Sequence, residues 1–156
     1  MKTGFVCSAF DLCHAGHLLM LEECASNCDI LIAGLHTDPT SDRPEKNRPI
    51  ETVYQRHLRL KSNVFINEII PYETEEDLLV ILKSLNIDVR FLGDDYISKT
   101  EYTGCKLNIE IHYCKRYGYS SSGLRKKIQI LESKLIALGH ISFLFSFVNV
   151  SCSKIR

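Results

Sequence analysis

The chain has 156 residues, which is enough for one domain with a substantial buried core. Its 19 basic residues balance its 19 acidic ones, and this zero net charge argues against a broad surface for nucleic acid or for an anionic membrane. The seven scattered cysteines form no C-x-x-C pair and Met1 leads directly into an apolar strand, so we expect free thiols, no secretory signal and a cytoplasmic protein.

The hydrophobic pattern predicts strands that alternate with helices. Strands are expected near 3–9, 29–35, 64–70, 88–92 and 108–113, and helices near 16–27, 52–62, 74–85 and 121–138. This alternation favours an α/β fold, with a parallel sheet covered by helices on both faces. Ligands of such sheets bind at the carboxyl ends of the strands, so functional residues are expected at those ends.

Two histidines, His14 and His17, stand where the first strand gives way to the first helix. Their i, i+3 spacing places them on one face of the first helical turn, where exposed N–H groups and the helix dipole favour an anion. Gly16 between them would allow a ligand to approach the backbone. A metal site with Cys7 and Cys13, or a packed structural role for either histidine, is the alternative.

The run Phe10-Asp11-Leu12-Cys13-His14-Ala15-Gly16-His17 resembles the H-x-G-H signature of the cytidylyltransferase-like nucleotidyltransferases. The resemblance covers residues 3 to 130 and is closest to the glycerol-3-phosphate cytidylyltransferases, on account of a Gly-Asp-Asp-aromatic segment. The further segments that carry it are His36-Thr37-Asp38, Lys46-Asn47-Arg48-Pro49 with Arg56, Asn86-Ile87-Asp88-Val89 running into Gly93-Asp94-Asp95-Tyr96, and Gly118-Tyr119-Ser120-Ser121-Ser122 leading to Arg125.

This resemblance implies a single Rossmann-like doubly wound domain over residues 1–138 and a homodimer. It also implies an enzyme that moves CMP from CTP onto a small phosphomonoester such as glycerol-3-phosphate and releases pyrophosphate. The implied cofactor is Mg²⁺, held mainly by the triphosphate and water without a dedicated metal cage in the protein. The chemistry is then positioning and charge stabilisation, with no covalent nucleophile.

Four residues are catalytic by this resemblance. His14 and His17 would contact the triphosphate and stabilise the pentavalent centre and the leaving pyrophosphate. Lys46 would be a mobile loop cation that reaches the α-phosphate and the incoming phosphate, and Arg56 would grip the phosphate of the acceptor. The alternatives are a solvated loop charge for Lys46 and a surface salt bridge for Arg56.

The resemblance also implies a set of nucleotide-binding residues. They are Ser8, Ala9, Phe10, Asp11, Gly16, Gly93, Asp94, Lys115, Arg116, Tyr119, Ser120, Ser121 and Ser122. The three serines would hold the β- and γ-phosphates, although helix capping alone would explain one of them. Either Lys115 or Arg116 fills the family's arginine position. Asp94 would face the base or ribose, and Asp11 would orient a histidine or a water bound to the metal.

Some alternatives stay open. Ser8-Ala9 stands where the family has Gly-Thr, which removes a threonine hydroxyl from the phosphate turn. A low-activity nucleotide-binding protein of the same fold is therefore one alternative, and an adenylyltransferase for a sugar or cofactor phosphate is another. An alditol phosphate, phosphocholine and phosphoethanolamine are equally open as acceptors, because all present the same attacking phosphate.

Residues 139–156 form an apolar C-terminal extension that the resemblance does not reach. Its apolar run, 140–150, is shorter than the roughly twenty residues that span a bilayer, so we expect no stable membrane insertion. The alternation of Ser142, Phe143, Phe145 and Phe147 favours an added strand. A lid over the core or a subunit contact is the alternative.

Overall fold

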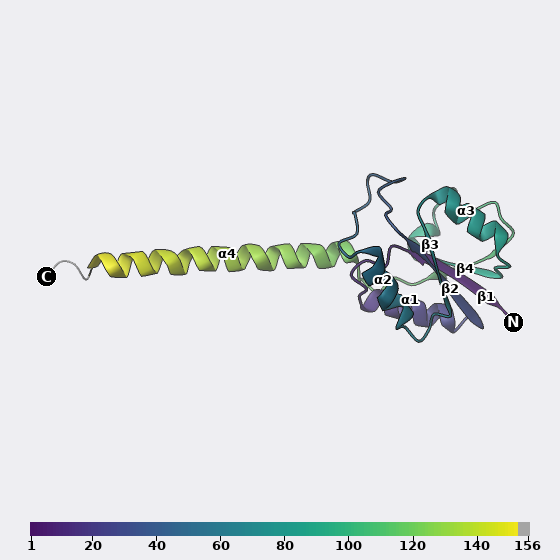
Figure 1. The fold of residues 1–156 in the computed structure, drawn as a ribbon, viewed down its shortest axis with the longest axis horizontal. Helices are drawn as coiled ribbons and strands as arrows, with labels where there is room; N and C mark the ends of the chain where they lie inside the picture. The colour runs from purple at the N-terminus through teal and green to yellow at the C-terminus, as the bar shows by residue number, and fades with distance from the viewer. Residues whose placement is uncertain (153–156) are drawn as a thin grey trace. The chain divides into compact units, whose positions relative to one another are not determined.

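The computed structural model describes the backbone of residues 1–152 and the side chains of residues 1–137. The chain divides into two compact units, Met1–Ser121 and Ser122–Arg156. The first is an α/β unit and contains every strand of the described residues, whereas the described part of the second belongs to one helix (Figure 1).

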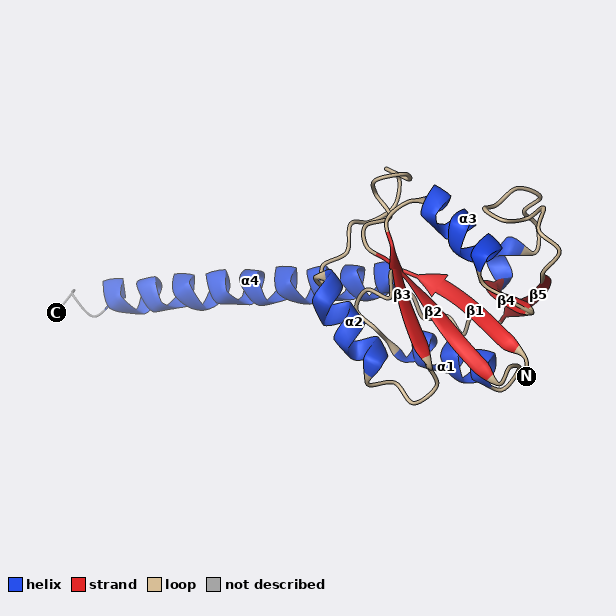
Figure 2. Ribbon diagram, turned by 45° about the vertical axis from the view of Figure 1, so that its right-hand side comes forward, coloured by secondary structure: helices blue, strands red, loops and turns tan. Residues whose placement is uncertain are grey.

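Five parallel strands form the sheet of the first unit in the order β3-β2-β1-β4-β5 (Figure 2). They are β1 (Thr3–Ser8), β2 (Ile30–His36), β3 (Glu68–Tyr72), β4 (Val89–Gly93) and β5 (Glu110–Cys114). The connecting segments contain α1 (Ala15–Ala25), α2 (Val53–Lys61), α3 (Glu75–Ser84) and the short helix η1 (Asp94–Tyr96). The predicted α/β fold is confirmed, and the strand order reverses between β1 and β4, where such sheets bind ligands.

Both faces of the sheet are buried, as a parallel sheet requires. Adjacent residues of β1 point to opposite sides: Val6 packs in a cluster with Leu21 of α1 and Leu60 of α2, and Phe5 packs in another with Leu78 of α3. The period-two alternation of a strand therefore places α1 and α2 on one face and α3 on the other (Figure 2).

Strand β3 begins four residues later than predicted, because the apolar run that starts at Val64 opens with a turn. The Oδ1 atom of Asn63 accepts a hydrogen bond from Phe65 N at 2.9 Å, and the side chain of Val64 is exposed. An asparagine that bonds the backbone two residues ahead is typical of a turn, so pairing with β2 starts only at Glu68.

Helix α4 spans Ser121–Cys152, so the strand predicted within the apolar run 140–150 is wrong. A helix satisfies its backbone groups within its own segment, whereas a single strand needs a neighbour with which to pair. None of the described helices is long and apolar enough to cross a membrane. The roles predicted for this run, as a lid or as a subunit contact of a homodimer, depend on side chains outside the described residues. They stay predictions, as does the domain boundary at 138.

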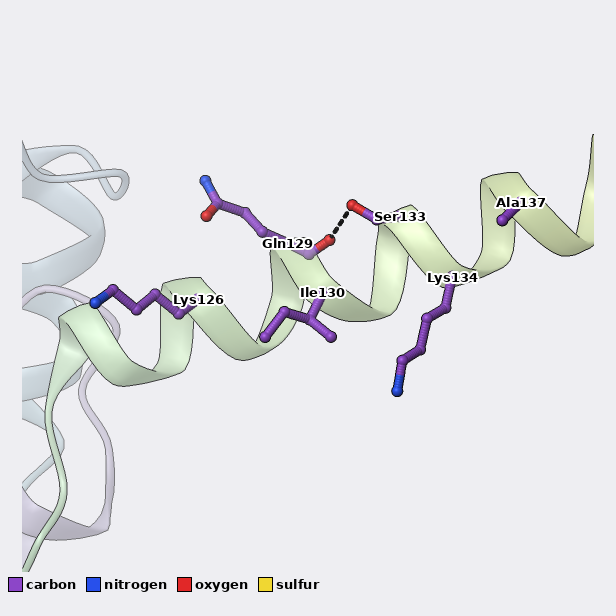
Figure 3. A pocket seen from close by; sticks show the side chains of 6 residues that line it. All are labelled: Lys126, Gln129, Ile130, Ser133, Lys134 and Ala137. Atoms are coloured by element: carbon purple, nitrogen blue, oxygen red, sulfur yellow. Dashed lines mark hydrogen bonds between the residues drawn. The ribbon is translucent and has the colours of Figure 1, made fainter.

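A hollow on the surface of α4 is shown in Figure 3. The six residues that line it all belong to this one helix: Lys126, Gln129, Ile130, Ser133, Lys134 and Ala137. Side chains of a single helix diverge from its axis, and none of these six forms an opposing wall. A ligand held there would stay largely in water, unlike one in a ligand pocket, which buries most of its surface.

Candidate active site

The turn that joins β1 to α1 is strained. Phe10 and Leu12 have positive φ angles of 49° and 52°, a conformation that costs a non-glycine residue about 1–3 kcal/mol. The surroundings hold this turn in place: Phe10 N donates to Ser8 Oγ at 3.3 Å, and Leu12 N donates to Glu51 Oε2 at 3.0 Å. A fixed and strained turn at the carboxyl end of the central strand is typical of a functional site.

Asp11, within the turn, ties it to two distant segments. Its buried carboxylate accepts hydrogen bonds from Ile50 N and Glu51 N, each at 3.0 Å. Its carbonyl accepts one from Ser121 Oγ at 2.9 Å. The residue was expected to orient a histidine or a metal-bound water, and the structure adds an anchoring role that the sequence did not indicate. Glu51, which also holds the turn, was not predicted at all.

His14 and His17 lie together at the start of α1, as their spacing predicted. Their rings stack with centroids 4.1 Å apart at an interplanar angle of 22°. His17 Nδ1 accepts a hydrogen bond from His14 N at 3.4 Å, so a neutral His17 carries its proton on Nε2. His14 Nδ1 is buried and has no hydrogen-bond partner among the described residues. This nitrogen faces Gly16 inside the protein, since a Cβ there would lie 3.1 Å from it, so a ligand would bond to the other ring nitrogen, Nε2.

The electrostatic environment keeps both imidazoles neutral near pH 7. Burial is the main cause that lowers the pKa of His17 to about 4; His14 lowers it further, and Asp11 partly opposes this effect. Burial also lowers the pKa of His14. An anion bound beside the rings would favour their protonated forms, because an opposite charge nearby stabilises the imidazolium. The pair is therefore suited to take up positive charge only when a polyanion arrives.

Gly16 is required by contacts within the protein. A Cβ atom at this position would lie 2.6 Å from Tyr119 Cβ and 3.1 Å from the ring of His14. The ring of Tyr119 lies beside that of His14, with a centroid distance of 6.4 Å. We expected this glycine to admit a ligand, and the structure shows that it admits the segment carrying Tyr119.

Arg56 is buried, which the sequence did not indicate. Its side chain is 1% exposed, and its guanidinium donates to backbone carbonyls of Glu51, Ala9, His36 and Thr37. These carbonyls come from the ends of β1 and β2 and from the residues before α2. With its donors directed at carbonyls in the interior, Arg56 is a positioning residue in this structure. The alternative of a surface salt bridge is wrong, and the expected grip on the acceptor phosphate stays a prediction.

A second cluster lies at the carboxyl ends of β4 and β5. Asp94 Oδ2 accepts from Arg116 N at 3.1 Å, and Asp95 Oδ1 lies 3.1 Å from Arg116 Nη2. A Cβ at Gly93 would lie 2.5 Å from Asp95 Oδ1, so the glycine permits this approach. Of the basic pair, Arg116 thus joins the Gly93–Asp95 segment, whereas Lys115 Nζ lies 5.7 Å from the ring centroid of Tyr117.

The two clusters share one edge of the sheet, because β1 and β4 are neighbouring parallel strands. Their register pairs Val6 with Phe91, and its continuation carries Ser8 toward Gly93.

Lys46 is exposed on the loop between β2 and α2, and within the described residues its ammonium group forms no ion pair. Ser120 precedes α4 and Ser122 lies in its first turn, in the second unit. The structure therefore assembles the histidine turn and the Gly93 segment, but not Lys46.

We predict that Arg56→Lys lowers the free energy of unfolding by about 3 kcal/mol or more, measured by urea denaturation. A lysine lacks the planar fork that reaches several carbonyls, and each buried carbonyl left unpaired costs about 1–3 kcal/mol. The matched control is Arg59→Lys on the same helix, where an arginine that is 55% exposed pairs with Glu51 at 2.7 Å. This control should cost less than about 1 kcal/mol. Equal losses of unfolding free energy in the two variants would contradict the role of the Arg56 guanidinium in holding these carbonyls.

A second prediction concerns His17. Its imidazole C–H signals in proton NMR should titrate with a midpoint of about 4. Because the unfolded chain binds this proton near pH 6.5 and the folded chain does not until about 4, stability should fall as the pH drops through that window. Relative to His17→Asn, wild type should lose on the order of 3 kcal/mol between pH 7 and pH 4. A midpoint near 6.5 would show that the ring is not desolvated.

Comparison with known proteins is consistent with this geometry. The family profile described as cytidylyltransferase-like matches residues 5–127. The chain is 30% identical over 132 residues to a glycerol-3-phosphate cytidylyltransferase of Bacillus spizizenii, a match that covers 84% of this chain and 100% of that protein. It is 32% identical over 130 residues to the bifunctional protein HldE of Helicobacter pylori strain HPAG1, covering 82% of this chain but 28% of that protein.

Among solved structures, the fold is similar to a lipopolysaccharide core biosynthesis protein from Thermoplasma volcanium. The TM-score is 0.60 at 22% identity, over 77% of this chain and 99% of that one. This similarity supports the α/β fold, and the family is identified by the sequence relatives. The chain belongs to the cytidylyltransferase-like family, and it spans less than a third of the length of the HldE relatives that it matches.

Proposed function

We propose that this protein transfers CMP from CTP to a small phosphomonoester such as glycerol-3-phosphate and releases pyrophosphate. The observation that carries the proposal is the stacked pair His14 and His17 at the start of α1, where burial lowers the pKa of both imidazoles. The full-length match to a glycerol-3-phosphate cytidylyltransferase supports the choice of nucleotide and acceptor.

The chemistry follows from the position of the pair. An oxygen of the acceptor phosphate attacks the α-phosphorus in line; a new P–O bond forms, the bond to the β-phosphate oxygen breaks, and its electron pair leaves with pyrophosphate. His17 Nε2–H and the ring of His14 would donate to phosphate oxygens as charge develops on them. The N–H groups at the start of α1 add to this stabilisation. The protein then needs no covalent nucleophile, because orientation and charge stabilisation lower the barrier.

The acidic side chains of this edge would leave the coordination of a magnesium ion mainly to the substrate. Asp11 Oδ1 accepts two backbone N–H groups, and Asp94 Oδ2 accepts one from Arg116. With these oxygens engaged, triphosphate and water would be the main ligands of Mg²⁺. When bound, the ion would neutralise phosphate charge, and Lys46 on its loop would approach the α-phosphate and the acceptor.

We predict that His14→Ala and His17→Ala each lower the rate of pyrophosphate release by about 10²–10³-fold with CTP and glycerol-3-phosphate. The fold should remain, because α1 keeps its backbone hydrogen bonds without either ring, and circular dichroism checks this. His57→Ala, a histidine on α2 with no assigned role, is the matched control. Near wild-type turnover in both variants would remove the histidines from the mechanism, and their unfolding would favour a structural role.

We also predict that CTP with Mg²⁺ raises the melting temperature more than ATP with Mg²⁺ does at equal concentration. A ligand at about 100 times its Kd adds roughly 2.7 kcal/mol, which gives a measurable shift. Phosphocholine and phosphoethanolamine, tested beside glycerol-3-phosphate in the release assay, identify the acceptor. A larger shift with ATP would instead indicate an adenylyltransferase, and binding without turnover would indicate a nucleotide-binding protein.

A further inference from the structure

A group of possible metal ligands lies where α1 packs against β5. One ligand atom from each of Glu23, His112 and Cys114 lies within 4.8 Å of the others. His112 Nε2 and Glu23 Oε1 are 2.9 Å apart. These residues have no part in the nucleotidyl transfer described above. They combine a carboxylate, an imidazole and a thiol, which is a ligand set typical of Zn²⁺.

The fold brings the three residues together. His112 and Cys114 stand two positions apart on β5, so the alternation of the strand directs both side chains to the face covered by α1. Glu23 lies in the last turns of α1, one residue before Cys24. The Sγ atoms of Cys24 and Cys114 are 3.7 Å apart in the core, which shows how closely the helix approaches the strand.

The environment leaves part of this group without a partner. Glu23 Oε2 is buried and has no hydrogen bond within the described residues. The side chains of Glu23 and His112 are 25% and 30% exposed, so an ion could enter from solvent. Ligand atoms on one zinc ion lie roughly 3.3–3.8 Å apart, given metal–ligand distances of about 2.0–2.3 Å. Side-chain shifts of about 1 Å would therefore bring the three atoms onto one ion.

We propose that Glu23, His112 and Cys114 form a binding site for a divalent metal ion of the zinc type, which joins α1 to β5. Water occupies the fourth position. On binding, the Cys114 thiol releases its proton to solvent, and His112 binds through Nε2 with its proton on Nδ1. The hydrogen bond between Glu23 and His112 is thereby replaced by two bonds to the metal.

The site would stabilise the edge of the sheet. β5 is an edge strand, and the basic pair Lys115 and Arg116 follows it directly. α1 begins at the histidine turn. An ion that joins this helix to this strand would fix the helix that begins at the histidine turn and the strand that leads into the basic pair. Its role is structural, and transfer of CMP takes place without any bond to it.

The test uses the full chain, stripped with a chelator and kept reduced, to which Zn²⁺ or Co²⁺ is added. We expect one ion per chain, a rise in melting temperature of about 3 °C or more with Zn²⁺, and a thiolate-to-cobalt charge-transfer band with Co²⁺. Glu23→Gln and Cys114→Ser should each weaken binding by more than about 100-fold, since loss of an outer partner alone costs about 10–100-fold.

Matched controls distinguish metal binding at this site from metal binding by other residues. Glu22→Gln makes the same change one residue earlier on an exposed side chain, and Cys28→Ser removes another thiol just beyond the end of the same helix. Both should keep the ion. Because Cys114 is buried and its variant could lose stability, the partly exposed Glu23 keeps the test decisive. Unchanged affinity in Glu23→Gln, a missing charge-transfer band, or loss of the ion in His14→Ala instead would overturn the proposal.

Discussion

One buried charge holds the candidate active site together. The guanidinium of Arg56 bonds carbonyls of Ala9, His36 and Thr37, which lie just beyond or at the ends of the two strands β1 and β2. Burial lowers the pKa of Arg56, but an arginine pKa starts so high that the group stays charged. A buried cation is costly unless its donors are satisfied, so the carbonyls and the guanidinium hold one another in place. The carboxyl edge of the sheet, where the substrate must bind, therefore has a fixed geometry.

The strained turn depends on this arrangement. Phe10 and Leu12 keep positive φ angles only because the residues before α2 hold the turn, through Glu51 and through the N–H groups that Asp11 accepts. This turn also places the histidine pair at the start of α1. The rest of the fold holds this turn in its strained conformation. As a result, two neutral and partly desolvated imidazoles lie beside the N-terminus of a helix. This arrangement is suited to bind an anion, because a bound triphosphate would supply negative charge and a hydrogen-bond partner to the imidazoles.

Local signals predicted much of this, and the failures have physical causes. The hydrophobic periodicity predicted the parallel α/β fold correctly. The i, i+3 spacing predicted the contact between His14 and His17. The burial of Arg56 was not predicted, because it depends on carbonyls that are distant in sequence and converge only in the fold. Likewise, nothing local indicates that Glu23 meets His112, 89 positions later. The C-terminal run was mistaken for a strand because a few alternating residues do not reveal whether a pairing partner exists.

Isotope transfer tests the central claim, that the histidine turn supports attack of an acceptor phosphate on the α-phosphorus. Glycerol-3-phosphate carrying ¹⁸O in its non-bridging phosphate oxygens would be incubated with CTP, Mg²⁺ and the protein, and the products examined by ³¹P NMR. If the acceptor oxygen attacks, ¹⁸O occupies the new bridge between the two phosphorus atoms of the product, and the released pyrophosphate is unlabelled. A product without ¹⁸O in that bridge, or release of labelled inorganic phosphate, would contradict this account of the site.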